Sequence, residues 1–128
     1  MEINFSDKEQ AFRDELDEFL QRELPNDWAE KPISWPHDYA RSGYQDEGDS
    51  VIASTFMDKV AEKGWLTLFW RNEEGSPDYS YMEQAIFEER MSYYRAPRQD
   101  NIGTGIVAPV SYTHLRAHET EADLVCRL

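Results

Sequence analysis

The chain lacks several features that common protein functions require. Its 128 residues include a single cysteine, Cys126, so no internal disulfide can form and a reducing compartment is expected. Lysine and arginine total 13 against 26 aspartates and glutamates, and the formal net charge of −13 argues against nucleic acid and anionic membrane surfaces as partners. No apolar run is long enough to span a membrane, and the first residues contain no apolar signal core. We therefore expect a cytoplasmic protein without membrane insertion.

The sequence also lacks a Gly-rich phosphate loop, because neither G-x-G-x-x-G nor a Walker signature occurs. What it does contain suits one packed domain, with 40% apolar and 13% aromatic residues. These proportions argue against global disorder. No residue is assigned to cofactor binding on this basis.

Three helices are predicted from local signals. The first begins at the capping box of Ser6 and Glu9, in which each side chain accepts from an otherwise unpaired backbone N–H, and it ends before Pro25. Its apolar stripe predicts the inward residues, which are Phe12, Leu16, Phe19, Leu20 and Leu24.

The second helix is predicted over residues 50–63, with Asp49 or Ser50 as its cap and Gly64 as the left-handed residue that ends it. Its predicted inner face consists of Ile52, Ala53, Phe56, Met57 and Val60. Residues 65–70 are predicted to be extended and largely apolar, and residues 72–78 to form a polar loop.

The third helix is predicted to begin at a second capping box, Ser80 with Glu83, and to end before Pro97. Its predicted inner residues are Met82, Ala85, Ile86 and Tyr93, with Glu89 at the margin. As carboxylates, Glu83, Glu88 and Glu89 are assigned to its solvated face rather than to catalysis or metal binding. Residues 101–109 resemble the start of a fourth, buried helix.

Residues 25–49 form a long connection that contains Trp28, Trp35, Tyr39 and Tyr44. A connection of this length is unusual in a compact domain unless it is packed or functional. We favour the interpretation that its aromatic side chains anchor the loop on the helices. The alternative is that they form the rim of a substrate entrance or a contact between subunits.

The block of residues 63–97 resembles the N-terminal helical domain of the acyl-CoA dehydrogenases. The resemblance rests on Gly64-Trp65, the apolar run 66–70, the acidic loop Glu73-Glu74-Gly75 and the helix that follows Ser80. Residues 103–109 extend it, so that it covers nearly all of residues 3–109. The chain departs from the family pattern at Arg71, where the family usually has proline.

This resemblance implies an all-α, N-terminal helical-bundle domain over residues 1–109, incomplete and with three to four helices. It implies a parent protein that is a homo-oligomer, binds FAD and desaturates acyl-CoA thioesters in fatty-acid or related catabolism. In that family FAD and the catalytic glutamate lie in parts absent from this chain, so the fragment is expected to be inactive and to bind no cofactor. The resemblance also offers Ile102, Thr104, Ile106 and Val107 as one wall of the acyl cavity, although these residues could equally be plain core, which we slightly favour.

Residues 110–128 differ sharply in composition from the rest of the chain. They read VSYTHLRAHETEADLVCRL and resemble a translated sequencing adapter of the transposase-based kind. The codons GTC TCT TAT ACA CAT CTC CGA GCC CAC GAG give Val110 through Glu119, and a second constant stretch gives Leu124 to Leu128. We therefore interpret residues 110–128 as a non-native tail, and Pro109 as ambiguous.

This interpretation removes several candidate sites. His114 and His118, spaced i and i+4, could share a metal on a helix with Glu119, but their origin in an adapter argues against it. Cys126 likewise loses its claim to be a nucleophile. Two other function classes stay open. One is a small non-catalytic helical interaction domain that uses exposed aromatics between Trp28 and Tyr44, and the other is a carboxylate metal bundle.

Overall fold

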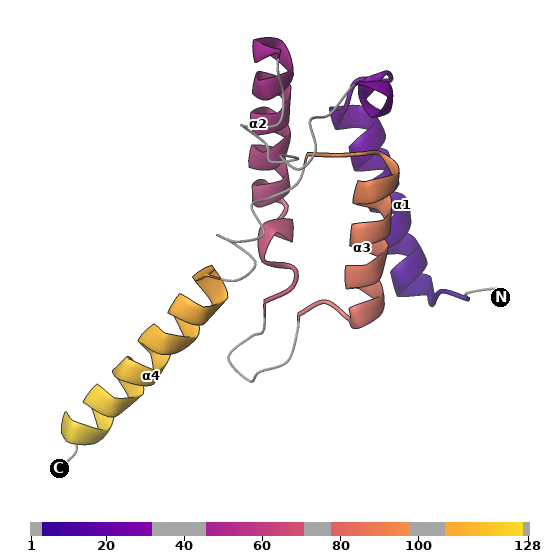
Figure 1. Cartoon of the computed structure of the whole chain (residues 1–128). Helices are drawn as coiled ribbons and strands as arrows, with labels where there is room; N and C mark the ends of the chain where they lie inside the picture. The colour runs from indigo at the N-terminus through magenta and orange to yellow at the C-terminus, as the bar shows by residue number, and fades with distance from the viewer. Residues whose placement is uncertain (1–3, 32–45, 71–77, 98–106, 127–128) are drawn as a thin grey trace.

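Helices account for all the regular secondary structure in the described part of the chain. The computed structural model describes residues 4–31, 46–70, 78–97 and 107–126, and within these ranges there is no strand. The elements are α1 (Asp7–Glu23), α2 (Glu47–Glu62), α3 (Tyr81–Tyr93) and α4 (Ala108–Cys126), with the 3-10 turns η1 (Trp28–Glu30) and η2 (Trp65–Thr67) (Figure 1). The predicted all-α fold is thereby confirmed.

Helix α1 begins and ends where its local signals predict. The Ser6 N–H donates to the Glu9 carboxylate at 2.7 Å, and the Glu9 N–H donates to Ser6 Oγ at 3.4 Å, which completes the capping box. The helix ends at the cap residue Leu24, directly before Pro25. All five predicted stripe residues are buried.

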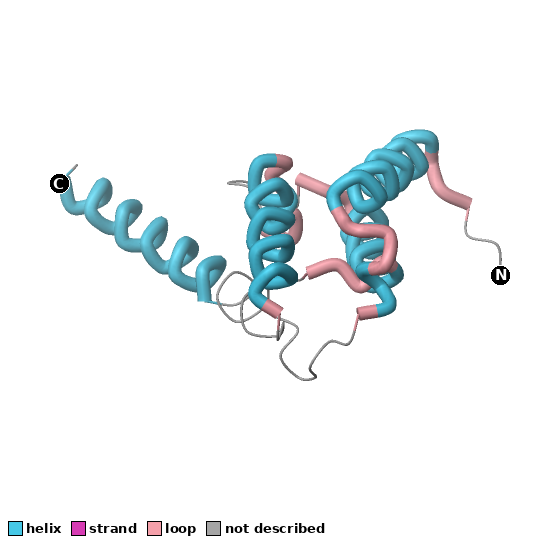
Figure 2. The backbone as a smooth tube through the Cα atoms, turned by 90° about the horizontal axis from the view of Figure 1, so that it is seen from above, coloured by secondary structure: helices cyan, strands magenta, loops and turns pink. Residues whose placement is uncertain are grey.

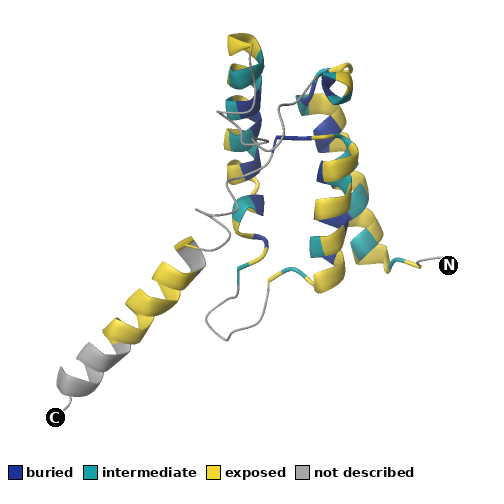
Figure 3. Cartoon of the chain, viewed as in Figure 1, coloured by how far each residue is buried: buried dark blue, intermediate teal, exposed yellow. Residues whose placement is uncertain are grey.

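The bundle core lies between α1, α2 and α3. Helices α1 and α3 pack together, and α2 stands beside them with η2 at its end (Figures 1 and 2). Aromatic contacts join the elements. The ring centroids of Phe19 and Phe56 are 5.5 Å apart, and the Trp65 ring centroid lies 5.1 Å from that of Phe19 and 6.1 Å from that of Phe87. Buried residues face this interior, whereas the outer surfaces are exposed (Figure 3). Aromatic side chains from three helices thus form one core.

Helix α2 begins earlier than predicted. It starts at Glu47, and its cap is Asp46, whose carboxylate accepts from the Gly48 N–H at 2.8 Å. The prediction treated Gly48 as a loop residue. In the first helical turn, however, backbone N–H groups have no partner within the helix, so an Asx cap can supply one. The predicted inner residues Ala53, Phe56 and Val60 are buried.

The segment after α2 is a 3-10 turn, and the prediction of an extended run was wrong. Gly64 does adopt the predicted left-handed conformation, with φ 76°. Beyond it, the Leu68 N–H donates to the Trp65 carbonyl at 3.3 Å, which makes Trp65 and Leu68 eclipse on one side. Both are buried, at 3% and 1% exposure, and Phe69 lies outside at 38%. A continuous run of apolar residues fits both the three-residue spacing of a 3-10 turn and the two-residue alternation of a strand, so the sequence alone does not distinguish them.

The capping box of α3 is confirmed, but the predicted inner face was largely wrong. Ile86 is buried as predicted, whereas Met82 and Tyr93 are 39% and 68% exposed and Ala85 is also exposed. The residues that face the core are Glu83, Ile86, Phe87 and Met91. Helix α3 therefore carries apolar side chains on two faces, and only the packing against α1 and η2 selects between them.

Helix α4 extends away from the bundle in both views (Figures 1 and 2). The ring centroids of Trp70 and Tyr112, which lies in the first turns of α4, are 6.2 Å apart. Its described side chains are exposed, including Val110 at 64% and Leu115 at 63%. Val107, in the segment that resembles the start of a fourth helix buried in the parent, is 53% exposed in this chain, and residues 101–106 lie outside the described residues.

Candidate functional site

The four predicted cavity residues are placed only in part. Ile102, Thr104 and Ile106 lie outside the described residues, and Val107 directly precedes α4 at the surface, 53% exposed. The described residues therefore do not assemble an enclosed acyl cavity around Val107. The described residues that come before Val107 in the chain end just after the C-terminus of α3.

That end of α3 closes with two hydrogen bonds of the Schellman type. The Arg95 N–H donates to the Ser92 carbonyl at 3.1 Å, and the Ala96 N–H donates to the Met91 carbonyl at 2.9 Å. Arg95 adopts φ 50°, the left-handed conformation that this motif requires and that glycine usually supplies. Ala96 and Pro97 come next in the chain, and both are buried.

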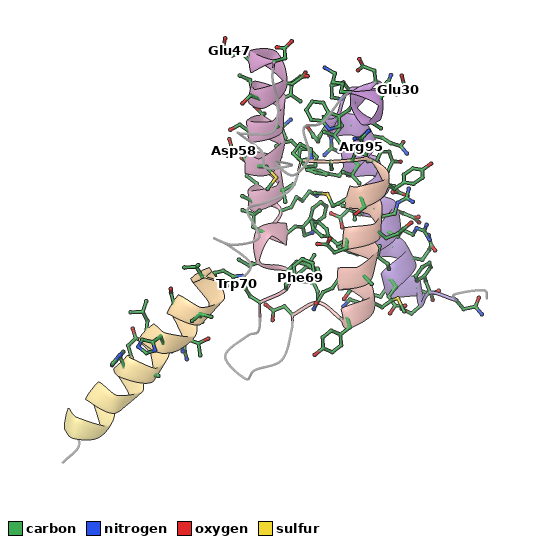
Figure 4. All side chains as sticks on the ribbon, in the orientation of Figure 1. Glu30, Glu47, Asp58, Phe69, Trp70 and Arg95 are labelled. Atoms are coloured by element: carbon green, nitrogen blue, oxygen red, sulfur yellow. The ribbon has the colours of Figure 1, made fainter. Side chains whose placement is uncertain are left out.

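The 3-10 turn η1 is bound to this helix end by two hydrogen bonds. The Trp28 indole Nε1–H donates to the Arg95 carbonyl at 3.1 Å, and the Arg95 guanidinium donates to the Ala29 carbonyl at 3.0 Å. Arg95 and Glu30, the last residue of η1, lie at the same end of the bundle (Figure 4). Trp28 is 2% exposed, so it anchors the connection after α1, as the favoured interpretation predicted. Trp28 is therefore not among the exposed aromatics that an interaction domain would use, and Trp35, Tyr39 and Tyr44 lie outside the described residues.

A small pocket lies beside this junction. Its volume is about 110 Å³, and its lining comprises Leu20, Gln21, Leu24, Pro25, Asn26, Trp28, Ala29 and Tyr94. Two of these lining residues are hydrogen-bonded to each other, because the Gln21 side-chain amide donates to the Tyr94 hydroxyl at 2.9 Å. Sites for drug-sized ligands enclose roughly 300–1,000 Å³, so this pocket can hold one small group but not a fatty-acyl chain.

Glu83 is the one charged residue among the buried residues that the structure describes, at 2% exposure. Its assignment to the solvated face was wrong, whereas Glu88 and Glu89 are exposed as predicted. Its carboxylate accepts from the Ser80 N–H at 2.7 Å and lies 3.2 Å from Lys8 Nζ. Burial acts to raise the pKa of Glu83, but the bonds from Ser80 and Lys8 outweigh it and the pKa is lowered. An ionised, fully bonded carboxylate of this kind suits a helix cap rather than a general base.

Most cations of the described bundle lie in ion pairs with carboxylates, whereas the Arg95 guanidinium donates to the Ala29 carbonyl. The paired residues are Lys8, Arg13, Arg22, Lys31, Lys59, Lys63 and Arg90. Several pairs join helices: Arg90 Nε bonds Asp17 across α1 and α3, and Lys59 bonds Glu23 across α1 and α2. A pyrophosphate such as that of FAD needs unpaired donors or a Gly-rich loop. The ion-paired cations and the lack of such a loop do not fit a phosphate site in the described bundle.

His114 and His118 stack edge to face on α4, with ring centroids 4.8 Å apart. A shallow depression of about 400 Å³ next to them is lined by Val110, Thr113, His114 and Ala117. Within residues 4–31, 46–70, 78–97 and 107–126, no group of three or more His, Cys, Asp or Glu side chains is arranged to hold a metal ion. In the same ranges, no helix is both long enough and apolar enough to cross a membrane.

Sequence reasoning missed Arg95. Pro97 indicates that α3 must end before it. The sequence around it does not indicate that Arg95 adopts the left-handed backbone conformation, or that Arg95 forms hydrogen bonds with Trp28 and Ala29. A glycine at this position would have been recognised.

Comparison with known protein families gives a match that covers most of the chain. The family model described as "Acyl-CoA dehydrogenase, N-terminal domain" matches residues 6–114. This range includes all three bundle helices and both capping boxes, and it extends past position 109. No curated protein and no solved structure gives a significant match to the chain.

Proposed function

Because the chain belongs to the acyl-CoA dehydrogenase N-terminal domain family, we propose that it is the opening part of an FAD-dependent enzyme that desaturates acyl-CoA thioesters. The observation that carries the proposal is the family match over residues 6–114, which coincides with an all-helical bundle. The parent enzyme is cytoplasmic and homo-oligomeric in this proposal.

In the proposed enzyme this domain contributes to substrate binding and leaves the chemistry to other parts of the parent. Ile102, Thr104, Ile106 and Val107 form one wall of the acyl cavity. FAD bound elsewhere in the parent would supply the hydride acceptor, and a glutamate outside this chain would supply the base for the substrate proton. The lowered pKa of Glu83 and the ion-paired cations support this division, because they offer neither a poised base nor a phosphate site in the part of the bundle that the structure describes.

The chain by itself should therefore have no dehydrogenase activity. Purified chain mixed with FAD, a panel of acyl-CoA thioesters and an artificial electron acceptor is expected to leave the flavin absorbance unchanged. Bleaching of FAD, or reduction of the acceptor, would show that residues 1–128 are sufficient and would overturn this part of the proposal.

The proposal also treats residues 110–128 as a non-native tail. The family match reaches residue 114, so the boundary at 109 needs an independent test. Amplification of the source DNA across codons 100–128 provides it. An uninterrupted reading frame that diverges from VSYTHLRAHE after codon 109 is expected, and expression of that longer frame should give a yellow, acyl-CoA-reducible flavoprotein. Genomic DNA that encodes residues 110–128 and then stops would instead favour a small interaction domain.

A further inference from the structure

The small pocket beside η1 has an apolar interior and a polar mouth. Leu20, Leu24 and Trp28 line it, and all three side chains are buried. Gln21 and Asn26 also line it, and both are exposed to solvent. Apolar walls with a few polar groups at the edge are the usual composition of a small-molecule site.

The volume of the pocket limits its ligand to about one ring. The pocket encloses about 110 Å³. An engineered apolar cavity of roughly 150 Å³ in another protein holds one benzene molecule. This pocket is smaller, but it opens to solvent between its exposed lining residues, so a substituent on the ring can project out of it.

The lining side chains favour a neutral aromatic ligand. None of the eight residues that line the pocket carries a formal charge at neutral pH, so a carboxylate or ammonium group would lose its hydration without gaining an ion pair there. Trp28 and Tyr94 supply two aromatic rings to the lining. Contacts between aromatic rings are worth more than the area they bury, so an aromatic ring is favoured over a saturated one.

The mouth of the pocket offers a hydrogen-bond donor. The Gln21 side-chain amide donates to the Tyr94 hydroxyl at 2.9 Å. This bond uses an acceptor position of the hydroxyl and leaves its O–H able to donate to a ligand oxygen. The Asn26 side chain adds a second polar group, which can donate or accept.

We propose that this pocket is a binding site for a neutral, single-ring aromatic molecule that carries one hydroxyl or carbonyl oxygen. The ring lies against Leu20, Leu24 and Trp28, and the ligand oxygen accepts from the Tyr94 hydroxyl. The lining residues come from α1, η1 and the end of α3, so a bound ligand joins these segments and stabilises the folded chain by mass action. The site does not depend on the proposed dehydrogenase function.

Titration of the 128-residue chain with phenol, followed by ¹H–¹⁵N NMR, tests the site. The Trp28 indole and the Gln21 side-chain amide report on the pocket, and the Trp65 indole in the bundle core is the internal reference. Phenol should shift the two pocket signals saturably, with a Kd of about 1 mM for a ligand of this size. Cyclohexanol should bind about fivefold more weakly because it lacks the ring contacts, and benzoate about tenfold more weakly because of its charge.

Two variants and a matched control locate the ligand. Ala29→Leu adds side-chain volume at the pocket and keeps the backbone carbonyl that accepts from Arg95, so phenol should bind at least about tenfold more weakly. Ala61→Leu makes the same substitution at an exposed position on α2 and should leave the affinity unchanged. Tyr94→Phe keeps the ring and removes the hydroxyl, so phenol should bind about fivefold more weakly while benzene binds equally well.

Thermal unfolding gives an independent measurement. Phenol should raise the Tm of the unsubstituted chain and of Ala61→Leu, and it should not raise that of Ala29→Leu. Equal phenol affinity in Ala29→Leu and Ala61→Leu, or shifts at Trp65 as large as those at Trp28, would overturn the site. If Ala29→Leu does not fold, Tyr94→Phe decides, because unchanged phenol affinity in that variant contradicts the assigned hydrogen bond and with it the proposed ligand class.

Discussion

The two capping boxes of this chain give a matched test of what burial adds to a helix cap. Ser6 with Glu9 and Ser80 with Glu83 have the same S-x-x-E spacing and the same pair of hydrogen bonds. The carboxylate-to-N–H bond is 2.7 Å in each. The bond at α1 is exposed to solvent, whereas Glu83 is 2% exposed in the core. We therefore expect the same substitution to have different effects at the two positions.

Glu9→Ala should lower the free energy of unfolding by about 0.5–1 kcal/mol, since water can replace the lost partner. Glu83→Ala removes a similar cap and also leaves the Ser80 N–H without its acceptor in a part-buried position, which adds about 1–2 kcal/mol. The expected total is about 2–3 kcal/mol. Lys8 is 75% exposed, so loss of its ion pair with Glu83 contributes little.

Glu83→Gln separates the hydrogen bond from the charge. Glutamine can still accept from Ser80, so this variant should lose only about 1 kcal/mol. Because the folded-state pKa of Glu83 lies below its ordinary value of 4.5, the ionised form stabilises the fold above that pH. This advantage over Glu83→Gln should disappear as the pH falls through the folded-state pKa.

Urea unfolding followed by far-UV circular dichroism measures these differences at pH 7 and again near pH 3. Equal losses for Glu9→Ala and Glu83→Ala would refute the argument from burial. A loss for Glu83→Gln as large as that for Glu83→Ala would show that charge, rather than the cap, is the dominant contribution.

Two further predictions use the same unfolding assay. Leu16→Ala should lose about 2–5 kcal/mol because Leu16 is fully buried, whereas Val51→Ala, at 61% exposure, should stay within about 0.5 kcal/mol; similar losses would contradict the assigned core. The bonds from Lys59 and then Arg22 lower the pKa of Glu23, so the stability that Glu23 contributes above pH 4.5 should be lost on acidification. Glu23→Gln should accordingly lose less stability than the unsubstituted chain between pH 6 and pH 3, and parallel pH profiles would argue against this linkage.

Helix termini with local capping signals were the most predictable part of the fold. The capping boxes at Ser6 and Ser80 and the left-handed Gly64 are determined by residues within a turn of one another, so the letters contain the whole interaction. Helix α2 was less predictable because Gly48, which favours loops, tolerates the first helical turn when Asp46 caps it. The structure of residues 65–70 depended on Trp65 reaching Phe19 and Phe87, contacts that no local window contains.

The site was less predictable than the fold, for a related reason. The family resemblance named residues 102–107 as cavity wall, but a wall is defined by the groups that face it, and Val107 is exposed in this chain. The hydrogen bond from Arg95 to the Ala29 carbonyl joins segments 66 residues apart, so its signal is distributed over the sequence. Arginine at a glycine position resembles an ordinary surface residue until Trp28 and Ala29 are placed beside it.

The error on α3 gives a last test, because both of its apolar faces satisfy the helical period. Sequence periodicity assigned Tyr93 to the core, and packing assigns Phe87, which is 5% exposed against 68% for Tyr93. Phe87→Ala should therefore lose about 3–5 kcal/mol of unfolding free energy. Tyr93→Ala should lose no more than about 1 kcal/mol, from its stacking on Arg90 at 4.7 Å and Tyr94 at 5.3 Å. The reverse order would mean that α3 is rotated about its axis relative to this structure, and that the stripe predicted from the sequence is the one that packs.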